Sequence, residues 1–201
     1  RVVAIVLSSS SLFLLHYALC LYPVWVSGYE KPQYLMVDLF QTVTPEALQH
    51  AARVLAPARY GYLGFLNPLT GWPHISRVAL GRDAHHTPLI LISSLSAHFA
   101  ALQADARCSL LVGEPGAGDP LAHARITLEC LAVRCSEELR PALRDAFVQW
   151  QPKSKLYVDF ADFTFWQLQP QSASFNAGFG KAFTLTANDV QQLLQQLPTE
   201  V

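Results

Sequence analysis

Three serines and a histidine follow an apolar run in the middle of the chain. The run at residues 89–92 leads directly into Ser93, Ser94 and Ser96, and His98 stands two residues further on. A serine at the start of a helix can accept a hydrogen bond from an early backbone N–H. The N–H groups that stay free, together with the positive end of the helix dipole, favour an anion. These residues are a candidate phosphate seat, and a capped helix without a ligand is the alternative interpretation.

A second candidate group lies on a strand that we predict over residues 72–80. Ser76 and Arg77 are neighbours, so their side chains face opposite sides of the strand. Only one of them can face a site, together with Ile75 or Val78. An arginine in an otherwise apolar strand needs a carboxylate, a phosphate or solvent as its partner. A surface arginine is therefore the alternative to a ligand contact.

A third candidate group alternates with apolar residues over residues 123–133, which is the period of a half-buried strand. His123, Arg125 and Thr127 are predicted to share its polar face. An imidazole, a guanidinium and a hydroxyl on one strand face are either solvated or line a polar site.

Composition argues against several other kinds of site. The 14 Lys and Arg residues and 15 Asp and Glu residues nearly balance, and no basic run occurs, which argues against non-specific nucleic-acid binding. The cysteines form no CxxC pair and the histidines no HExxH motif, so we expect no metal site. Cys108, Cys130 and Cys135 have apolar surroundings that suit reduced, buried thiols, and a cytoplasmic location is expected. The fourth cysteine is Cys20.

Periodic patterns predict the elements that position these groups. Helices are expected at residues 45–55 with Thr44 as cap, over about ten residues after the serines with Leu95 on the apolar face, and at residues 137–150 and 186–197. Strands are expected at residues 59–66, 72–80, 89–92, 108–112, 123–133, 160–168 and 172–179, with a polar loop at 81–87. Hairpins dominate and no strand–helix–strand series repeats. The fold class is therefore mainly β, an α+β fold with a small, mostly antiparallel barrel and flanking helices. Such a barrel is filled by its own side chains, so a cofactor should lie outside it.

The N-terminal segment, residues 1–35, is set apart from the predicted domain at residues 36–201. Residues 2–28 carry no charged side chain and are long enough to span a bilayer. Three interpretations stay open: a membrane anchor, a signal sequence, or non-native sequence upstream of a start at Met36.

Three stretches together resemble the pyridoxamine 5'-phosphate oxidase-like, FMN-binding split-barrel family, and within it the branch associated with haem utilisation. They are RYGYLGFLNPLTGWPHISRVAL, PLILISSLSAHFAALQADARCSLLVGEPGAGDPLAHARITLEC and YVDFADFTFWQLQPQSASFNAGFGKAF. The resemblance covers roughly residues 45–190. It implies a six-stranded antiparallel split β-barrel that forms a homodimer, with FMN at the subunit interface.

The resemblance also implies roles for single residues. Residues that match the strand holding the flavin and its phosphate are Ile75, Ser76, Arg77 and Val78. Ser93 and Ser94 match the end of the next strand, which places hydroxyl or amide groups on the phosphate or ring. Ser96 and His98 match a Ser-Arg-Lys phosphate grip, and His123 and Arg125 match a position near the flavin ring that is commonly Gln.

This chain departs from the oxidases at the grip, where the Arg-Lys pair is replaced by Ala97 and His98. Oxidation of pyridoxamine phosphate itself is therefore not expected. Three hypotheses follow: a flavin-dependent oxidoreductase acting on a small molecule, a non-catalytic dimer that binds FMN or haem, and a structural dimer without flavin. FMN is the favoured cofactor and haem the alternative; no catalytic acid or base is assigned. No membrane partner is expected unless residues 2–28 are an anchor.

Overall fold

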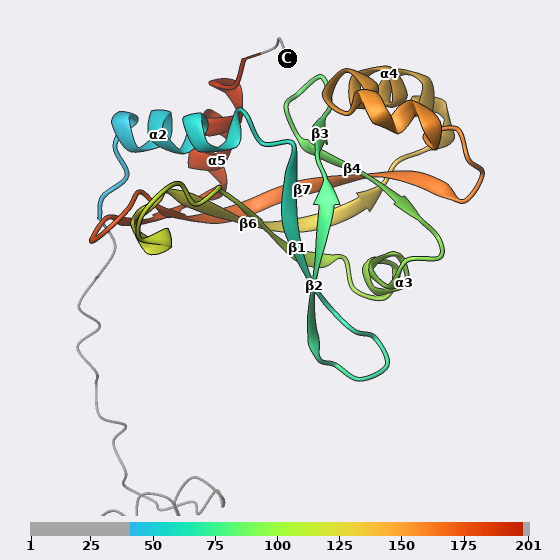
Figure 1. The fold of residues 1–201 in the computed structure, drawn as a ribbon, viewed down its shortest axis with the longest axis horizontal. Helices are drawn as coiled ribbons and strands as arrows, with labels where there is room; N and C mark the ends of the chain where they lie inside the picture. The colour runs from blue at the N-terminus through green and yellow to red at the C-terminus, as the bar shows by residue number, and fades with distance from the viewer. Residues whose placement is uncertain (1–40, 199–201) are drawn as a thin grey trace, which may run out of the picture. The chain divides into compact units, whose positions relative to one another are not determined.

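The computed structural model describes residues 41–198 (Figure 1). The predictions for residues 1–35 and for Cys20 lie outside this range. Within it, no helix combines the length and the apolar character needed to cross a bilayer.

One antiparallel sheet carries all the strands of the described part of the chain. In the order β2-β1-β5-β6-β7-β4-β3, neighbours are hydrogen-bonded, and β8 pairs with β7 off this path. The strands are β1 (Tyr60–Leu66), β2 (Pro73–Ala79), β3 (Gly81–Arg82), β4 (Pro88–Ser93), β5 (Arg107–Val112), β6 (Arg125–Arg134), β7 (Phe163–Asn176) and β8 (Ala182–Leu185). Six of them have at least six residues, and β3 and β8 are short additions. The predicted mainly antiparallel split barrel with flanking helices is confirmed.

The sheet curls because its two ends are covalently joined. β2 lies at one end of the strand order and β3 at the other, yet only Leu80 separates Ala79 from Gly81. Gly81 lets α4 pack closely on β3, because a Cβ there would lie 2.6 Å from Cδ2 of Phe147. The edge strand β2 also contacts β4, the neighbour of β3 at the other end of the strand order.

Among residues 41–198, four α-helices flank the sheet: α2 (Pro45–Leu55), α3 (Ala97–Ala104), α4 (Arg140–Trp150) and α5 (Ala187–Gln195). The short 3-10 helices are η1 (Pro120–Ala122), η2 (Glu137–Leu139) and η3 (Pro152–Leu156). Apolar residues of α2, α3 and α5 join the main core with the inward-facing strand residues. A second core forms where α4 packs on the other side of β4 and β7, through Leu143 and Phe147 against Leu89, Leu91 and Phe165. Figure 1 shows α4 beside β3 and β4, well apart from α2 and α5.

The outer side of β2, β1, β5 and β6 has no such helix among residues 41–198, and we call it the uncovered face. Its apolar side chains stay in solvent, with Ile75 74%, Leu66 42% and Leu131 37% exposed. Their strand neighbours Phe65 and Cys130 point the other way and are buried. The amphipathic alternation of these strands is therefore incomplete, because both sides carry large apolar groups.

Several predicted elements differ from the structure. The loop at 81–87 begins with β3, whose Arg82 is buried rather than solvated. Leu95 precedes α3 and is 88% exposed, so its place on the helix face was wrong. The two strands predicted at 160–168 and 172–179 form the single strand β7, with a register shift opposite Glu129 and Cys130. No strand was predicted at β8, whose four residues are too short a pattern to read.

Candidate functional site

The serine turn, residues 93–96, joins β4 to α3. Ser96 is the residue before α3, as the sequence suggested, but its side chain does not cap the helix. Its Oγ donates to the carbonyl of Ser93 at 2.8 Å instead. Ser93 Oγ accepts from the N–H of Leu95 at 3.1 Å and donates to the carboxylate of Asp162. Two of the hydroxyls therefore hold the turn itself, and Ser94 is the exposed one.

The turn offers hydrogen-bond donors to an anion but little positive charge. The first N–H groups of a helix have no acceptor within the helix and need one from elsewhere. In α3 no capping side chain supplies it. His98 is half-buried, and this burial lowers the pKa of its imidazole, which favours the neutral form. The carboxylate of Asp162 lies directly behind Ser93. The turn can therefore hydrogen-bond a phosphate through Ser94 and the helix N–H groups. It supplies no positive charge in place of the Arg-Lys pair of the oxidases, which is Ala97 and His98 here.

Arg77 lies on the uncovered face. The helix α3, which follows the serine turn, packs on the opposite, inner side of the sheet. Its guanidinium donates to the hydroxyl of Tyr62 at 3.1 Å and lies over the rings of Tyr60 and Tyr62 at 5.2 and 5.3 Å. A hydrogen bond with Glu114 raises the pKa of the Tyr60 phenol, so this neighbour of Arg77 stays protonated. No carboxylate of the described residues forms an ion pair with Arg77.

The other residues of β2 divide between its two sides. Ser76 is paired opposite Leu63 and Val78 is buried, whereas Ile75 is exposed beside Gly64. The prediction that Ser76 and Arg77 face opposite sides is confirmed. The side chains of residues 75–78 therefore cannot all face the same ligand, because they divide between the two sides of β2.

His123 and Arg125 hold a loop in this chain. His123 precedes β6, so it is not on the strand as predicted; its Nε2 lies 3.0 Å from the carbonyl oxygen of Ala117. Arg125 Nη1 donates to the carbonyls of Leu121 and His123 at 3.2 and 3.3 Å. Both side chains therefore order the connection between β5 and β6.

A cavity of about 660 Å³ opens on the uncovered face. Its lining includes apolar residues of the β1–β2 hairpin, and polar residues of the neighbouring strands that the sequence did not single out: Arg107, Ser109, Glu129 and Gln171. They were missed because each is a common residue on an alternating strand. Only the pairing of β1, β5, β6 and β7 brings them together.

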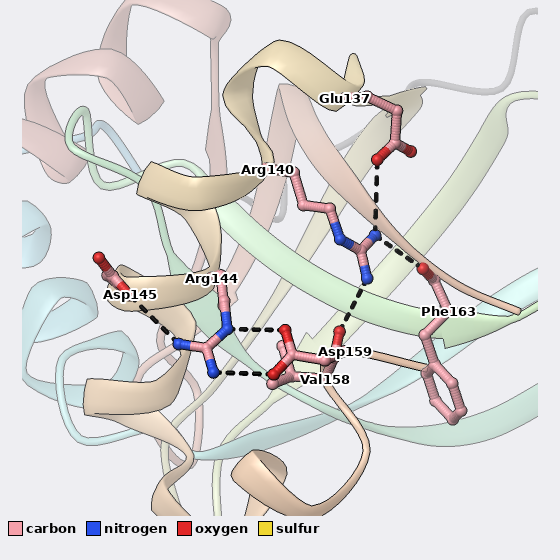
Figure 2. Close-up of polar contacts among 7 residues, drawn as sticks. All are labelled: Glu137, Arg140, Arg144, Asp145, Val158, Asp159 and Phe163. Carbon is pink, nitrogen blue, oxygen red and sulfur yellow. Dashed lines mark hydrogen bonds and ion pairs between the residues drawn. The ribbon is translucent and has the colours of Figure 1, made fainter. Parts of the chain in front are cut away.

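Two arginines on α4, Arg140 and Arg144, hold the segment between Val158 and Phe163 (Figure 2). Arg140 donates to the carbonyls of Val158 and Phe163 at 2.8 and 2.9 Å. Arg144 forms a two-bonded ion pair with Asp159. Asp162 lies between these anchor points, and its carbonyl accepts a hydrogen bond from the N–H of Ser94. The two arginines, which we call the clamp, therefore position the serine turn through this segment.

Known proteins resemble this chain over most of the described range. It is 36% identical over 121 residues to "Non-canonical heme oxygenase HOZ, chloroplastic" of Arabidopsis thaliana, covering 59% of this chain and 36% of that protein. The chain thus spans about a third of that relative. A solved heme binding protein from Mycobacterium smegmatis is 31% identical, with a TM-score of 0.66 over 75% of this chain and 62% of that one. Another solved chain is 42% identical, with a TM-score of 0.66 over 74% of this chain and 97% of the other.

More distant structures share the fold alone. A protein of the pyridoxinephosphate oxidase family from Clostridium acetobutylicum has a TM-score of 0.58 at 13% identity, over 74% of this chain and 99% of that one. A FAD-binding protein from Mesorhizobium loti has a TM-score of 0.53 at 14% identity, over 67% of this chain and 95% of the other. No protein-family model matches the chain. The curled antiparallel sheet and these structures together show that the chain has the split-barrel fold shared with a protein of the pyridoxinephosphate oxidase family, and that its relatives above 30% identity include a heme oxygenase and a heme binding protein.

Proposed function

We propose that this protein binds haem on the uncovered face, between two copies of the chain. The observation that carries the proposal is that the two named relatives described above at more than 30% identity are named for haem. The flavin-named neighbour is similar at the level of the fold only.

The uncovered face has the chemistry that such a ligand needs. Haem presents a wide apolar ring and two propionates, so it requires apolar contact on one side and cations at its edge. Ile75, Leu66 and Leu131 supply exposed apolar surface beside the cavity of about 660 Å³. Arg77 supplies a guanidinium that is held by two tyrosine rings and is free of carboxylate partners among residues 41–198. A guanidinium binds a carboxylate through two parallel hydrogen bonds, which fixes its orientation.

Titration with haem, followed by the Soret absorbance, tests this proposal. Wild-type protein should bind haem saturably, and Arg77→Ala should weaken binding by about tenfold, the loss of one charged contact. Arg134→Ala is the matched control, because Arg134 is also exposed near a strand end; neither arginine lines the cavity itself, but Arg77 lies two residues from Ile75, which does. Arg82 is unsuitable as a control, because it is buried and bonded to two carbonyls. Equal haem affinity in the two variants would contradict the site.

FMN remains a second candidate because of the exposed Ser94 and the uncapped start of α3. If these groups bind the FMN phosphate, FMN should bind more tightly than riboflavin, which lacks it. Ser94→Asp should abolish that difference by placing a carboxylate at the seat, whereas Ser136→Asp, at another exposed serine before a helix, should preserve it. Fluorescence titration measures both affinities. Equal binding of FMN and riboflavin by the wild type would remove this candidate. Oxygen uptake with NADPH would identify a flavin oxidoreductase.

A further inference from the structure

A second cavity lies at the opposite end of β4 from the serine turn. It has a volume of about 480 Å³, within the range of small-molecule sites. One wall is formed by Leu139 of η2 and by Ala142 and Ala146 of α4. The facing wall is the turn between β3 and β4, with Arg82, Asp83, His85 and His86, and Gln149, Trp150 and Gln167 complete the lining. It shares no lining residue with the cavity on the uncovered face.

Arg82 is the unusual group in this lining. Only 6% of the residue is exposed, and its Nη2 donates to the carbonyls of Leu55 and Ala56 at the end of α2, each at 2.6 Å. Its Nη1 has no hydrogen-bond partner among residues 41–198. A buried donor without an acceptor is destabilising, and most such groups in proteins are paired. The guanidinium therefore has an unused donor that is closed to solvent, in a residue that lines the cavity.

The surroundings of Arg82 also lack compensating negative charge. Its guanidinium lies 4.4 Å from the centre of the Trp150 ring, and that of Arg59 lies 4.3 Å from the same ring. Within the described part of the chain, neither arginine forms an ion pair. Burial, with a smaller contribution from Arg59, lowers the pKa of Arg82 to about 10. At neutral pH the guanidinium thus stays charged.

The one carboxylate in the lining is already occupied. Asp83 Oδ1 accepts from the N–H groups of His85 and Thr87 at 2.8 and 2.9 Å, and Oδ2 accepts from Gln167 Nε2 at 2.6 Å. These bonds shape the turn and direct Asp83 toward its own backbone. Asp83 therefore does not neutralise Arg82.

We infer that this cavity is a binding site for a small organic carboxylate with a flat apolar body. The carboxylate would supply the acceptor and the negative charge that Arg82 lacks, and the apolar body would pack against the alanines of α4 and against Trp150. A guanidinium prefers a carboxylate to a neutral amide because the hydrogen bond is charge-assisted. The site is separate from the uncovered face and does not depend on whether haem or FMN binds there.

Benzoate is the probe, with benzamide as its neutral counterpart, and NMR titration of the intact protein is the measurement. Ala142→Glu places a competing carboxylate in the cavity from an exposed position of α4, where glutamate suits a helix. Ala187→Glu, at the exposed start of α5, is the matched control. Wild type and Ala187→Glu should bind benzoate saturably and about tenfold more tightly than benzamide, and Ala142→Glu should lose benzoate binding.

Three outcomes would overturn the inference. They are no saturable binding of benzoate by the wild type, equal binding of benzoate and benzamide, and unchanged benzoate binding by Ala142→Glu. Arg82→Ala is not used, because loss of the bonds to Leu55 and Ala56 could unfold the protein for reasons unrelated to a ligand.

Discussion

Individual side chains in this protein do not all do what their position in the sequence suggests. Ser96 stands before α3 where a capping serine belongs, but its hydroxyl bonds to the carbonyl of Ser93. Ser93 in turn is tied to Asp162, which is 69 residues away in the chain. A hydroxyl can donate and accept, so its residue type alone does not select its partner. The choice follows from which groups the fold brings near.

The free energy of unfolding should fall as the pH drops below about 6.5, in part because of His98. Burial lowers the pKa of its imidazole in the folded state, so the unfolded chain binds a proton more readily. Stability is therefore fully present above the unfolded pKa of about 6.5 and is lost as the pH falls through the folded value. His98→Gln should flatten the dependence measured by urea unfolding between pH 7 and 5.

The matched variant for this measurement is His85→Gln, in the exposed turn after β3, which should keep the wild-type slope. His50, whose pKa is lowered first by burial and then by Arg53, accounts for part of the slope that remains. An unchanged slope in His98→Gln would show that this imidazole is solvated in the folded protein.

At the scale of elements, α4 links the second core to the serine turn. Its apolar side buries Phe147 against β4 and β7, while Arg140 and Arg144 hold the segment before β7 (Figure 2). That segment places Asp162 against Ser93 and Ser94. The helix α4 thus positions the serine turn indirectly, because no residue of α4 hydrogen-bonds to a serine side chain of the turn.

Arg140→Ala should destabilise the protein by about 2 kcal/mol, because it leaves two partly buried carbonyls without their charged donor. Arg144→Ala removes an exposed ion pair and should change the free energy of unfolding much less. Urea unfolding of the two variants gives the comparison. Equal destabilisation would mean that the clamp acts through the exposed ion pair rather than through the two carbonyls.

At the scale of the whole molecule, the described domain has apolar residues on both sides of half of its sheet. The inner side is closed by α2, α3 and α5, and α4 covers the outer side of β3, β4 and β7. The uncovered face leaves Ile75, Leu66, Leu131 and Val133 in solvent. Exposed apolar patches of this kind commonly mark interaction surfaces. We therefore propose that the homodimer forms through this face.

Ile75→Asp should convert the proposed dimer to a monomer in sedimentation velocity, because it buries a charge at the centre of the interface. Leu156→Asp makes the same change at a residue that is 79% exposed, compared with 74% for Ile75, and lies on η3 away from this face. It should remain a dimer. Dissociation of both variants, or of neither, would place the interface elsewhere.

The sequence by itself determined the local elements and the fold class of this protein. The Thr44-Pro45 start of α2 and the hairpin with Gly71 at φ 72° were read correctly, because neighbouring residues set caps and tight turns. Alternation also separated Ser76 from Arg77, since the side-chain period of a strand is local. The family resemblance rested on the same contiguous stretches.

Only the tertiary structure decided which of these groups meet. The bond between Ser93 and Asp162, the burial of Arg82 under the end of α2, and the lining of both cavities join residues from distant parts of the chain. Residue spacing carries no record of such contacts, because they depend on how the sheet curls and on which side of it each helix packs. Arg82 shows this most clearly: the sequence places it in a polar loop, and in the fold it is a buried cation without a carboxylate partner among residues 41–198.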